Sequence, residues 1–196
     1  SDASLRSLWT NRYIWLVTAI FFMNNVLFYI ETGWLPVFFQ AKGLLPTQAA
    51  FTVSVLGLVS IPAILLIPFC SDRIGLRKPF LWVSGLASAA AAYGLVFSPT
   101  ILDAVFMGIL GATVAALFMI PLFLSIDLVE PRMVGSATGM IVSVGYLGGV
   151  VGPWTMGLIT DIAGGFGHIP ITLIIASIVA ALIALAMPET GRRRST

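Results

Sequence analysis

The sequence has very little charge for its length. Only 9% of its 196 residues are Asp, Glu, Lys or Arg, whereas 59% are hydrophobic, and the mean hydropathy is +1.04. A soluble globular domain carries about 25% charged and about 45–50% apolar residues. The 10 basic and 8 acidic side chains are too few for a water-soluble enzyme, a nucleic-acid-binding protein or a disordered segment, which excludes all three classes. The composition indicates an integral membrane protein.

Cysteine and histidine are almost absent as well. Cys70 is the one cysteine, so the sequence predicts no internal disulfide. His168, the one histidine, follows a glycine-rich stretch and has no metal ligands at a metal-binding spacing. An intramembrane serine protease would need a histidine within an apolar run to activate its nucleophile. We therefore expect no metal, no cofactor and no enzymatic activity.

Long apolar runs, by contrast, are abundant, and they predict an all-α membrane protein in which residues 1–196 form a single bundle of six transmembrane helices. Each run is close to the ~20 residues that a helix needs to cross ~30 Å of hydrocarbon. None alternates with the two-residue period of a membrane β-strand. Gly33 and Pro36 lie within the first run, so we expect a bend or a break near its end. The predicted spans are about 13–39, 47–70, 79–97, 101–126, 135–159 and 170–187.

The positive charges gather at one end of this predicted bundle. If the six spans alternate in direction, nine of the ten Lys and Arg residues fall at the end that holds both termini, and Lys42 alone falls at the other. The positive-inside rule places the nine in the cytoplasm, with both termini, and we expect the plasma (cell inner) membrane. The nine are Arg6, Arg12, Arg73, Arg77, Lys78, Arg132, Arg192, Arg193 and Arg194.

A short internal repeat connects the second and fifth predicted spans. Each ends in an Asp followed three residues later by Gly, namely Asp72 with Gly75 and Asp161 with Gly164. The two pairs fall at opposite ends of the bundle, which predicts two three-helix units in inverted orientation. Such 3+3 inverted repeats recur in secondary transporters, although a match this short also arises by chance.

Three segments resemble signatures of the major facilitator superfamily (MFS). Residues 71–78, SDRIGLRK, resemble its D-R-x-G-R-[RK] loop, in which Gly75 allows a tight turn. Residues 187–192, MPETGR, resemble the ending that follows the twelfth span, and residues 9–15, WTNRYIW, resemble the lead-in to the seventh. The span at 101–126 lacks the Arg-x3-Gly pattern of the N-terminal half. The resemblance covers the whole chain and implies the C-terminal six-helix half of an MFS transporter.

The fifth predicted span carries glycines four residues apart, a spacing that lets helix backbones approach closely. It resembles the glycine-rich eleventh span of the family, which implies a close-packed, bending helix. The expected packing residues are Gly145, Gly149, Gly152, Pro153 and Gly157.

The first predicted span resembles the cavity-lining seventh span of the family, and it holds the candidate substrate residues. If the helix enters the membrane near Trp15, Asn24 and Asn25 lie about 14 Å deep, near the midplane where transporter substrates bind. The two amides could equally hold neighbouring helices together. The full candidate cavity set is Asn24, Asn25, Phe28, Tyr29 and Glu31.

Glu31 is the most informative residue of this set. It lies roughly 24 Å from the inner edge, within the outer part of the hydrocarbon. A charged carboxylate facing lipid costs several kcal/mol, so the group must face water, meet a partner or be protonated. Two interpretations remain: a proton-coupling or gating acid, or an interfacial carboxylate in outer water near Gly33 and Pro36.

The resemblance implies a secondary active transporter that moves a small solute by alternating access, coupled to protons. Segment 24–36 looks most like the cyanate, nitrate and organic-anion branches, which implies an organic or inorganic anion. No Lys, Arg or His lies inside a predicted span, so a cation that pairs with an anion must come from elsewhere. The expected gating loop is Asp72, Arg73, Gly75, Arg77 and Lys78, with a helix of the other half as its partner.

The family's substrate path lies between two halves, whereas this chain holds one and begins at Ser1 without a methionine. We expect an N-terminal MFS half as partner, in the same polypeptide. Two alternatives remain: a half-length protein that transports as a homodimer, or a structural or regulatory membrane protein that does not transport.

Overall fold

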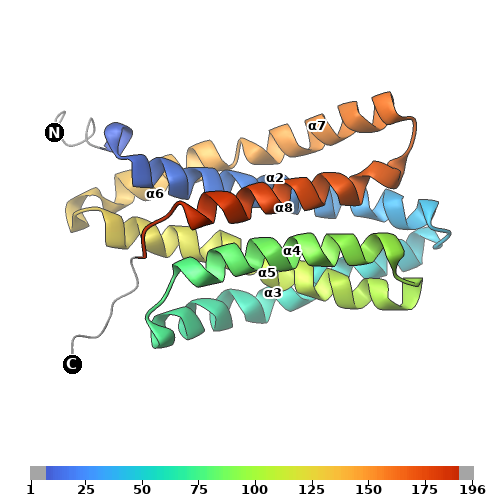
Figure 1. Ribbon diagram of the computed structural model, residues 1–196, viewed down its shortest axis with the longest axis horizontal. Coiled ribbons are helices and arrows are strands. Elements are labelled where there is room, and N and C mark those ends of the chain that lie inside the picture. Colours follow the sequence, from blue (N-terminus) through green and yellow to red (C-terminus); the bar gives the residue numbers. More distant parts are fainter. Residues whose placement is uncertain (1–7, 190–196) are drawn as a thin grey trace.

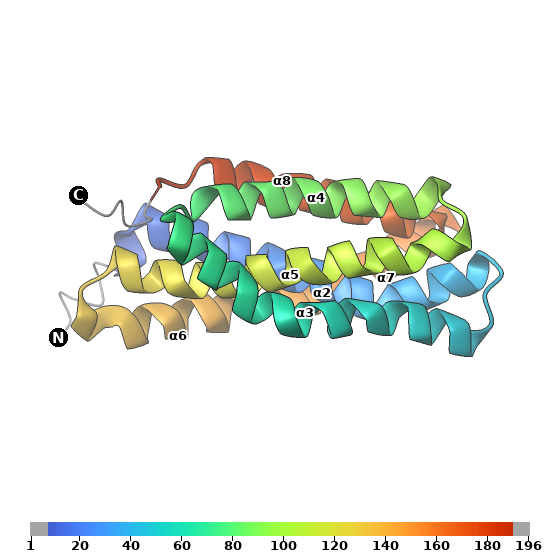
Figure 2. The same cartoon turned by 90° about the horizontal axis from the view of Figure 1, so that it is seen from below.

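The computed structural model of the chain describes residues 8–189, which fold into a bundle of helices with no strand among them (Figures 1 and 2). Six segments in this range are long and apolar enough to cross a membrane, as predicted. Two single-turn helices, η1 (Pro131–Met133) and η2 (Phe166–His168), begin the last two of these segments. The main helices are α2 (Arg12–Ala41), α3 (Pro46–Ile74), α4 (Lys78–Phe97), α5 (Thr100–Leu128), α6 (Val134–Gly145), α7 (Gly148–Ala163) and α8 (Ile169–Leu185).

Local sequence signals mark where these helices begin. Asn11 caps α2, since its side-chain oxygen accepts a hydrogen bond from the Tyr13 N–H at 2.9 Å. This cap gives residues 9–15 a structural role at the entry of the first span. Proline occupies the first turn of α3, α4 and α8, where its missing N–H leaves no helical bond unmade.

The interruption of a span lies in a different place from the one expected. Gly33 and Pro36 do not interrupt α2, which runs continuously from Arg12 to Ala41, because neighbouring helices and side chains support a proline inside a membrane helix. The fifth span instead divides into α6 and α7 at Tyr146 and Leu147. Three glycines flank this point at 145, 148 and 149, and the backbone bonds change to the three-residue spacing, as in Leu147 N–H to Val144 C=O at 3.2 Å.

The helix pairings repeat in the two halves of the chain. The first three spans (α2, α3, α4) correspond in order to the last three (α5, α6–α7, α8). Under this correspondence, the contact of α3 with α5 is equivalent to that of α7 with α2. The contact of α2 with α8 is likewise equivalent to that of α5 with α4. The α4–α8 and α2–α5 pairs map onto themselves. Equivalent spans run in opposite directions, so the arrangement is a 3+3 inverted repeat.

The Asp-x-x-Gly match marks equivalent corners of the two units. Gly75 ends α3 at φ 75° and ψ 22°, and Gly164 ends α7 at φ 71° and ψ 26°, a left-handed conformation that favours glycine. Each N–H donates to the carbonyl four residues back, to Ser71 at 2.9 Å and to Thr160 at 3.0 Å. The two corners lie at opposite ends of the bundle (Figure 1).

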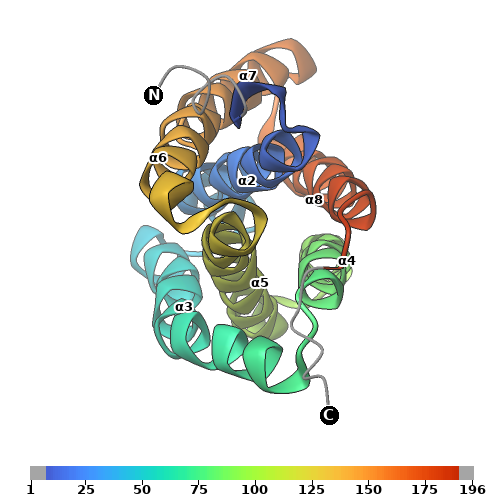
Figure 3. The same cartoon turned by 90° about the vertical axis from the view of Figure 1, so that its left-hand side faces the viewer.

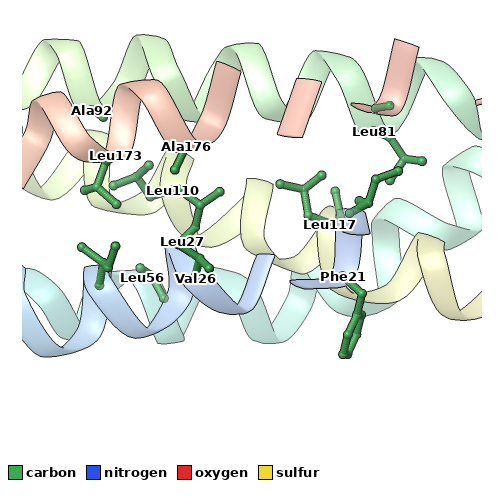
Figure 4. Close-up of a cluster of buried hydrophobic side chains, with 14 of the residues drawn as sticks. Phe21, Val26, Leu27, Leu56, Leu81, Ala92, Leu110, Leu117, Leu173 and Ala176 are labelled. Atoms are coloured by element: carbon green, nitrogen blue, oxygen red, sulfur yellow. The ribbon is translucent and has the colours of Figure 1, made fainter. Parts of the chain in front are cut away.

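Helices α2 and α5 form the centre of the bundle, as the view along its axis shows (Figure 3). Leu27 of α2, Leu110 of α5 and Leu173 of α8 are fully buried and point into one shared core (Figure 4). The large apolar side chains of α3 and α7 are mostly exposed, among them Phe51, Leu58, Leu65, Val150, Trp154 and Leu158.

The glycines of the fifth span bring α7 against the backbone of α2. A Cβ added at Gly148 would meet the carbonyl oxygen of Phe22, and one at Gly152 would lie 2.9 Å from the carbonyl oxygen of Val26. Pro153 follows inside α7. Only a residue without a side chain allows the two backbones to lie this close.

The remaining glycines of this span differ in their surroundings. A Cβ at Gly145 would meet the ring of Phe21, and one at Gly149 would lie 2.6 Å from the ring of Tyr29, so both also face α2. A Cβ at Gly157 would make ordinary contact, 3.5 Å from its nearest neighbour. The middle of the fifth span, on both sides of the interruption, therefore packs closely against α2.

Candidate functional site

The three most polar members of the candidate cavity set lie inside the six-helix unit. Asn24, Asn25 and Glu31 are 1%, 2% and 0% exposed. Asn25 is satisfied locally, because its Nδ2 donates to the Phe21 carbonyl at 2.9 Å. Glu31 is shielded from water, which argues against the interpretation of a carboxylate in outer-facing water. A substrate-contacting role for the three residues stays a prediction.

Asn24 and Glu31 share an unusual property. Their side-chain oxygens, Oδ1 of Asn24 and both oxygens of Glu31, are buried without a hydrogen-bond partner among the described residues. The two residues are seven apart, so they lie two turns apart on one face of α2. A buried acceptor left without a donor costs roughly 1–3 kcal/mol, so such groups in a native protein call for an explanation.

The aromatic members of the set lie elsewhere on α2. Tyr29 is 38% exposed, and its ring contacts that of Phe28 edge to face, with centroids 5.4 Å apart. Tyr29 also borders Gly149 of α7. The structure therefore does not gather all five candidates around one surface: Asn24 and Glu31 face inward, while Tyr29 faces outward.

The loop between α3 and α4 forms a charge cluster around Arg77. Its Nε lies 2.9 Å from Oδ2 of Asp127 at the end of α5, and its Nη2 lies 3.3 Å from Oδ1 of Asp72. The guanidinium also stands over the ring of Phe123, 5.5 Å from the centroid. Arg77 thus ties the ends of α3 and α5 to the start of α4.

The segment after α8 joins the same cluster. Oε1 of Glu189 accepts the main-chain N–H of Arg77 at 2.8 Å and that of Lys78 at 3.4 Å, at the start of α4. The first N–H groups of a helix have no partner within it, and a carboxylate there is favoured by the helix dipole. The expected partner in another half remains a prediction, since the partners found here, Asp127 and Glu189, belong to this chain. In the sequence, the one sign of the Glu189 contact was the Pro-Glu pair directly after the last span.

A second charge cluster, at the opposite end of the bundle, was missed by sequence reasoning. Lys42 Nζ lies 2.9 Å from both carboxylate oxygens of Asp103 and donates to the carbonyls of Leu95 and Ser98 at 3.0 and 3.3 Å. Asp103 is fully buried and also accepts from the Ser98 hydroxyl at 3.0 Å. Nothing in the sequence indicated this pair, because 61 positions separate Asp103 from Lys42.

Replacing Lys42 should destabilise the protein strongly. Lys42→Met leaves the Asp103 carboxylate buried without its cation, which costs about 3–5 kcal/mol and lowers the thermal midpoint in detergent by about 10 °C. Lys42→Met with Asp103→Asn should recover most of this loss, because no charge is then left unpaired. Strictly additive losses in the two single variants and the double variant would contradict this account.

Comparison with known proteins gives the family. The model described as Major Facilitator Superfamily matches residues 1–153 and 43–196. The 2-nitroimidazole transporter of Escherichia coli (strain K12) is 28% identical over 189 residues, 92% of this chain and 46% of that protein. A putative tartrate transporter of Agrobacterium vitis is 31% identical over 185 residues, 88% of this chain and 41% of that protein.

The glycerol-3-phosphate transporter of Bacillus subtilis (strain 168) is 26% identical over 199 residues, 93% of this chain and 43% of that protein. The chain thus spans less than half the length of these three relatives. All three are named as transporters, not as enzymes. The matched family model, the six apolar spans and the inverted repeat agree, and the chain belongs to the major facilitator superfamily.

Proposed function

We propose that this chain is one half of a secondary active transporter that carries a small anion by alternating access, coupled to protons. Membership of the superfamily and the named transporter relatives support transport itself. The finer proposal rests on Asn24 and Glu31 of α2, whose buried side-chain oxygens have no partner in the described part of the chain.

A carboxyl in the hydrophobic part of a transporter is costly as a free anion, so it is retained where it exchanges a proton or meets a partner. Glu31 takes the proton in one conformation and releases it in another, when its surroundings open to water. Asn24, two turns away on the same face, has an acceptor oxygen that is likewise buried without a partner among residues 8–189. Together they form the proposed coupling pair.

Two relatives suggest the class of solute. Tartrate and glycerol-3-phosphate are organic anions, and both occur in the relatives' names, although 2-nitroimidazole in the third name is not one. Among residues 8–189, the Lys, Arg and His side chains belong to the ends of the helices and the loops, so the proposed cation partner of the anion belongs to the other half.

The exposed apolar side chains of α3 and α7 support a large partner on that side of the bundle. Phe51 and Leu65 of α3 are each 73% exposed, and Trp154 of α7 is 67% exposed. Their helices flank the central pair α2 and α5 (Figure 3). An N-terminal MFS half, from the same polypeptide or from a second copy, covers this face in our proposal. The asymmetry of cations supports a plasma-membrane orientation with both ends of the chain in the cytoplasm.

The proposal is tested on the natural gene product, tagged at its chromosomal C-terminus and purified into proteoliposomes. We expect a mass near twice 20.9 kDa and accumulation of at least one anion from a panel of dicarboxylates, phosphate esters, nitrate and cyanate when a proton gradient is imposed. A protonophore should abolish that accumulation.

Other results decide against parts of the proposal. A product of 20.9 kDa that transports as a cross-linkable dimer would replace the fused half with a second copy. A product that moves none of the panel, or only neutral solutes, would refute anion transport.

A further inference from the structure

A cavity of about 400 Å³ lies between the start of α2, the start of α4 and the end of α8. These three helix ends lie next to one another in the end-on view (Figure 3). The polar lining residues are Arg12, Tyr13 and Lys78, and Leu16 and Leu185 contribute apolar walls. The cavity is separate from the proposed coupling pair, which lies deep within α2.

The two cations at this cavity have no acidic partner among the described residues. Arg12 donates to the hydroxyl of its neighbour Tyr13 at 2.6 Å, with its guanidinium 4.7 Å from the centre of that ring. The Lys78 side chain has no ion pair in residues 8–189, and the nearby acids Asp72 and Asp127 both pair with Arg77. Glu189 contacts Lys78 through the main-chain N–H. The cavity therefore combines an apolar wall with two cationic side chains that have no ion pair among residues 8–189.

The geometry points to a binding site for an anionic phospholipid at this cavity. Arg12 and Lys78 are the first residues of two membrane-spanning helices, so they lie where the hydrocarbon ends and the lipid phosphates begin. Leu16 lies one turn deeper than Arg12, at the depth of the acyl chains. Basic pockets between membrane helices on the cytoplasmic side suit anionic headgroups.

The surrounding sequence favours the same ligand. Arg6 precedes α2, and Arg192, Arg193 and Arg194 closely follow the cavity residue Pro188 in the chain. Clusters of basic residues beside a membrane helix attract anionic lipid. A free phosphate ion would use the cations alone, whereas a phospholipid also uses the apolar walls, so a lipid accounts for the whole lining.

The test is a titration of the full natural chain in detergent, followed by native mass spectrometry, with phosphatidylglycerol compared with phosphatidylcholine. Each cation is worth about a fivefold change in affinity, so Arg12→Gln with Lys78→Gln should weaken phosphatidylglycerol binding roughly 30-fold. Each single Gln variant should weaken phosphatidylglycerol binding about fivefold, whereas Lys78→Arg, which keeps the positive charge, should bind like the unchanged protein. Arg132 is an exposed cation near the same end of the bundle but outside the cavity. Arg132→Gln should therefore change the affinity for phosphatidylglycerol less than about twofold.

Excess inorganic phosphate distinguishes the two sources of a phosphate group. Phosphatidylglycerol that stays bound in excess phosphate supports a lipid site, while full competition would mean a site for the free ion. Equal binding of the two lipids, or unchanged phosphatidylglycerol binding in the correctly folded double variant, would overturn the proposal. If the double variant does not fold, the two single variants and Lys78→Arg decide in the same way.

Discussion

Glu31→Gln abolishes solute accumulation driven by a pH gradient and leaves solute exchange at equilibrium intact. The glutamine has nearly the same shape and stays polar, but it cannot take up or release a proton. Both oxygens of Glu31 are buried without a partner among residues 8–189, so protonation is the change available to this group inside the closed bundle. Accumulation should fall at least tenfold, to the level seen without a gradient, while exchange stays within about twofold.

The measurement compares gradient-driven uptake with counterflow in proteoliposomes made from the natural gene product. Glu130→Gln is the matched control, because Glu130 is an exposed acid that pairs with Arg132 at 2.7 Å. Gradient-driven uptake that persists in Glu31→Gln would remove Glu31 from coupling. Loss of uptake and exchange together would instead make it a residue of solute binding.

Gly148→Ala should prevent close packing of the fifth span against the first. The added methyl would meet the carbonyl oxygen of Phe22 and come within 3.2 Å of the Val26 nitrogen, and neither backbone atom can turn aside. Overpacking of this kind costs about 1–3 kcal/mol or more. We expect a sharp loss of monodisperse protein in size-exclusion chromatography and a lower thermal midpoint.

The control for this experiment comes from the same span. A Cβ at Gly139 meets nothing within 4 Å among the described residues. Because alanine favours helix by up to about 1 kcal/mol over glycine, Gly139→Ala should leave the thermal midpoint unchanged or raise it. Equal stability of the two variants would show that α2 and α7 are not held together by glycine.

Turn chemistry and span length were readable from the sequence, and they predicted most of the fold. Asp72 with Gly75 and Asp161 with Gly164 predicted equivalent corners, because a left-handed residue at a helix end is nearly always glycine. Apolar length gave six spans. The interruption at Tyr146 was missed, because small residues in a span suit both a continuous close-packed helix and a broken one.

The candidate site was less predictable, for a physical reason. α2 is apolar around its whole circumference, so its sequence gives the depth of a residue but not the direction of its side chain. Nothing local could separate the buried Glu31 from the exposed Tyr29. Long-range pairs such as Lys42 with Asp103 depend on the packing of helices far apart in the chain, which a single sequence does not specify.

The twin corners at Gly75 and Gly164 separate two kinds of information in this chain. One corner reads DRIGLRK and carries three cations, while the other reads DIAGGFG and carries none, yet their backbones turn alike. The shape of the turn depends on glycine, whereas the direction of insertion depends on cations that the turn does not need. One three-helix fold can therefore occur twice in a single gene, once in each orientation, because a few arginines and lysines determine which way each copy is inserted.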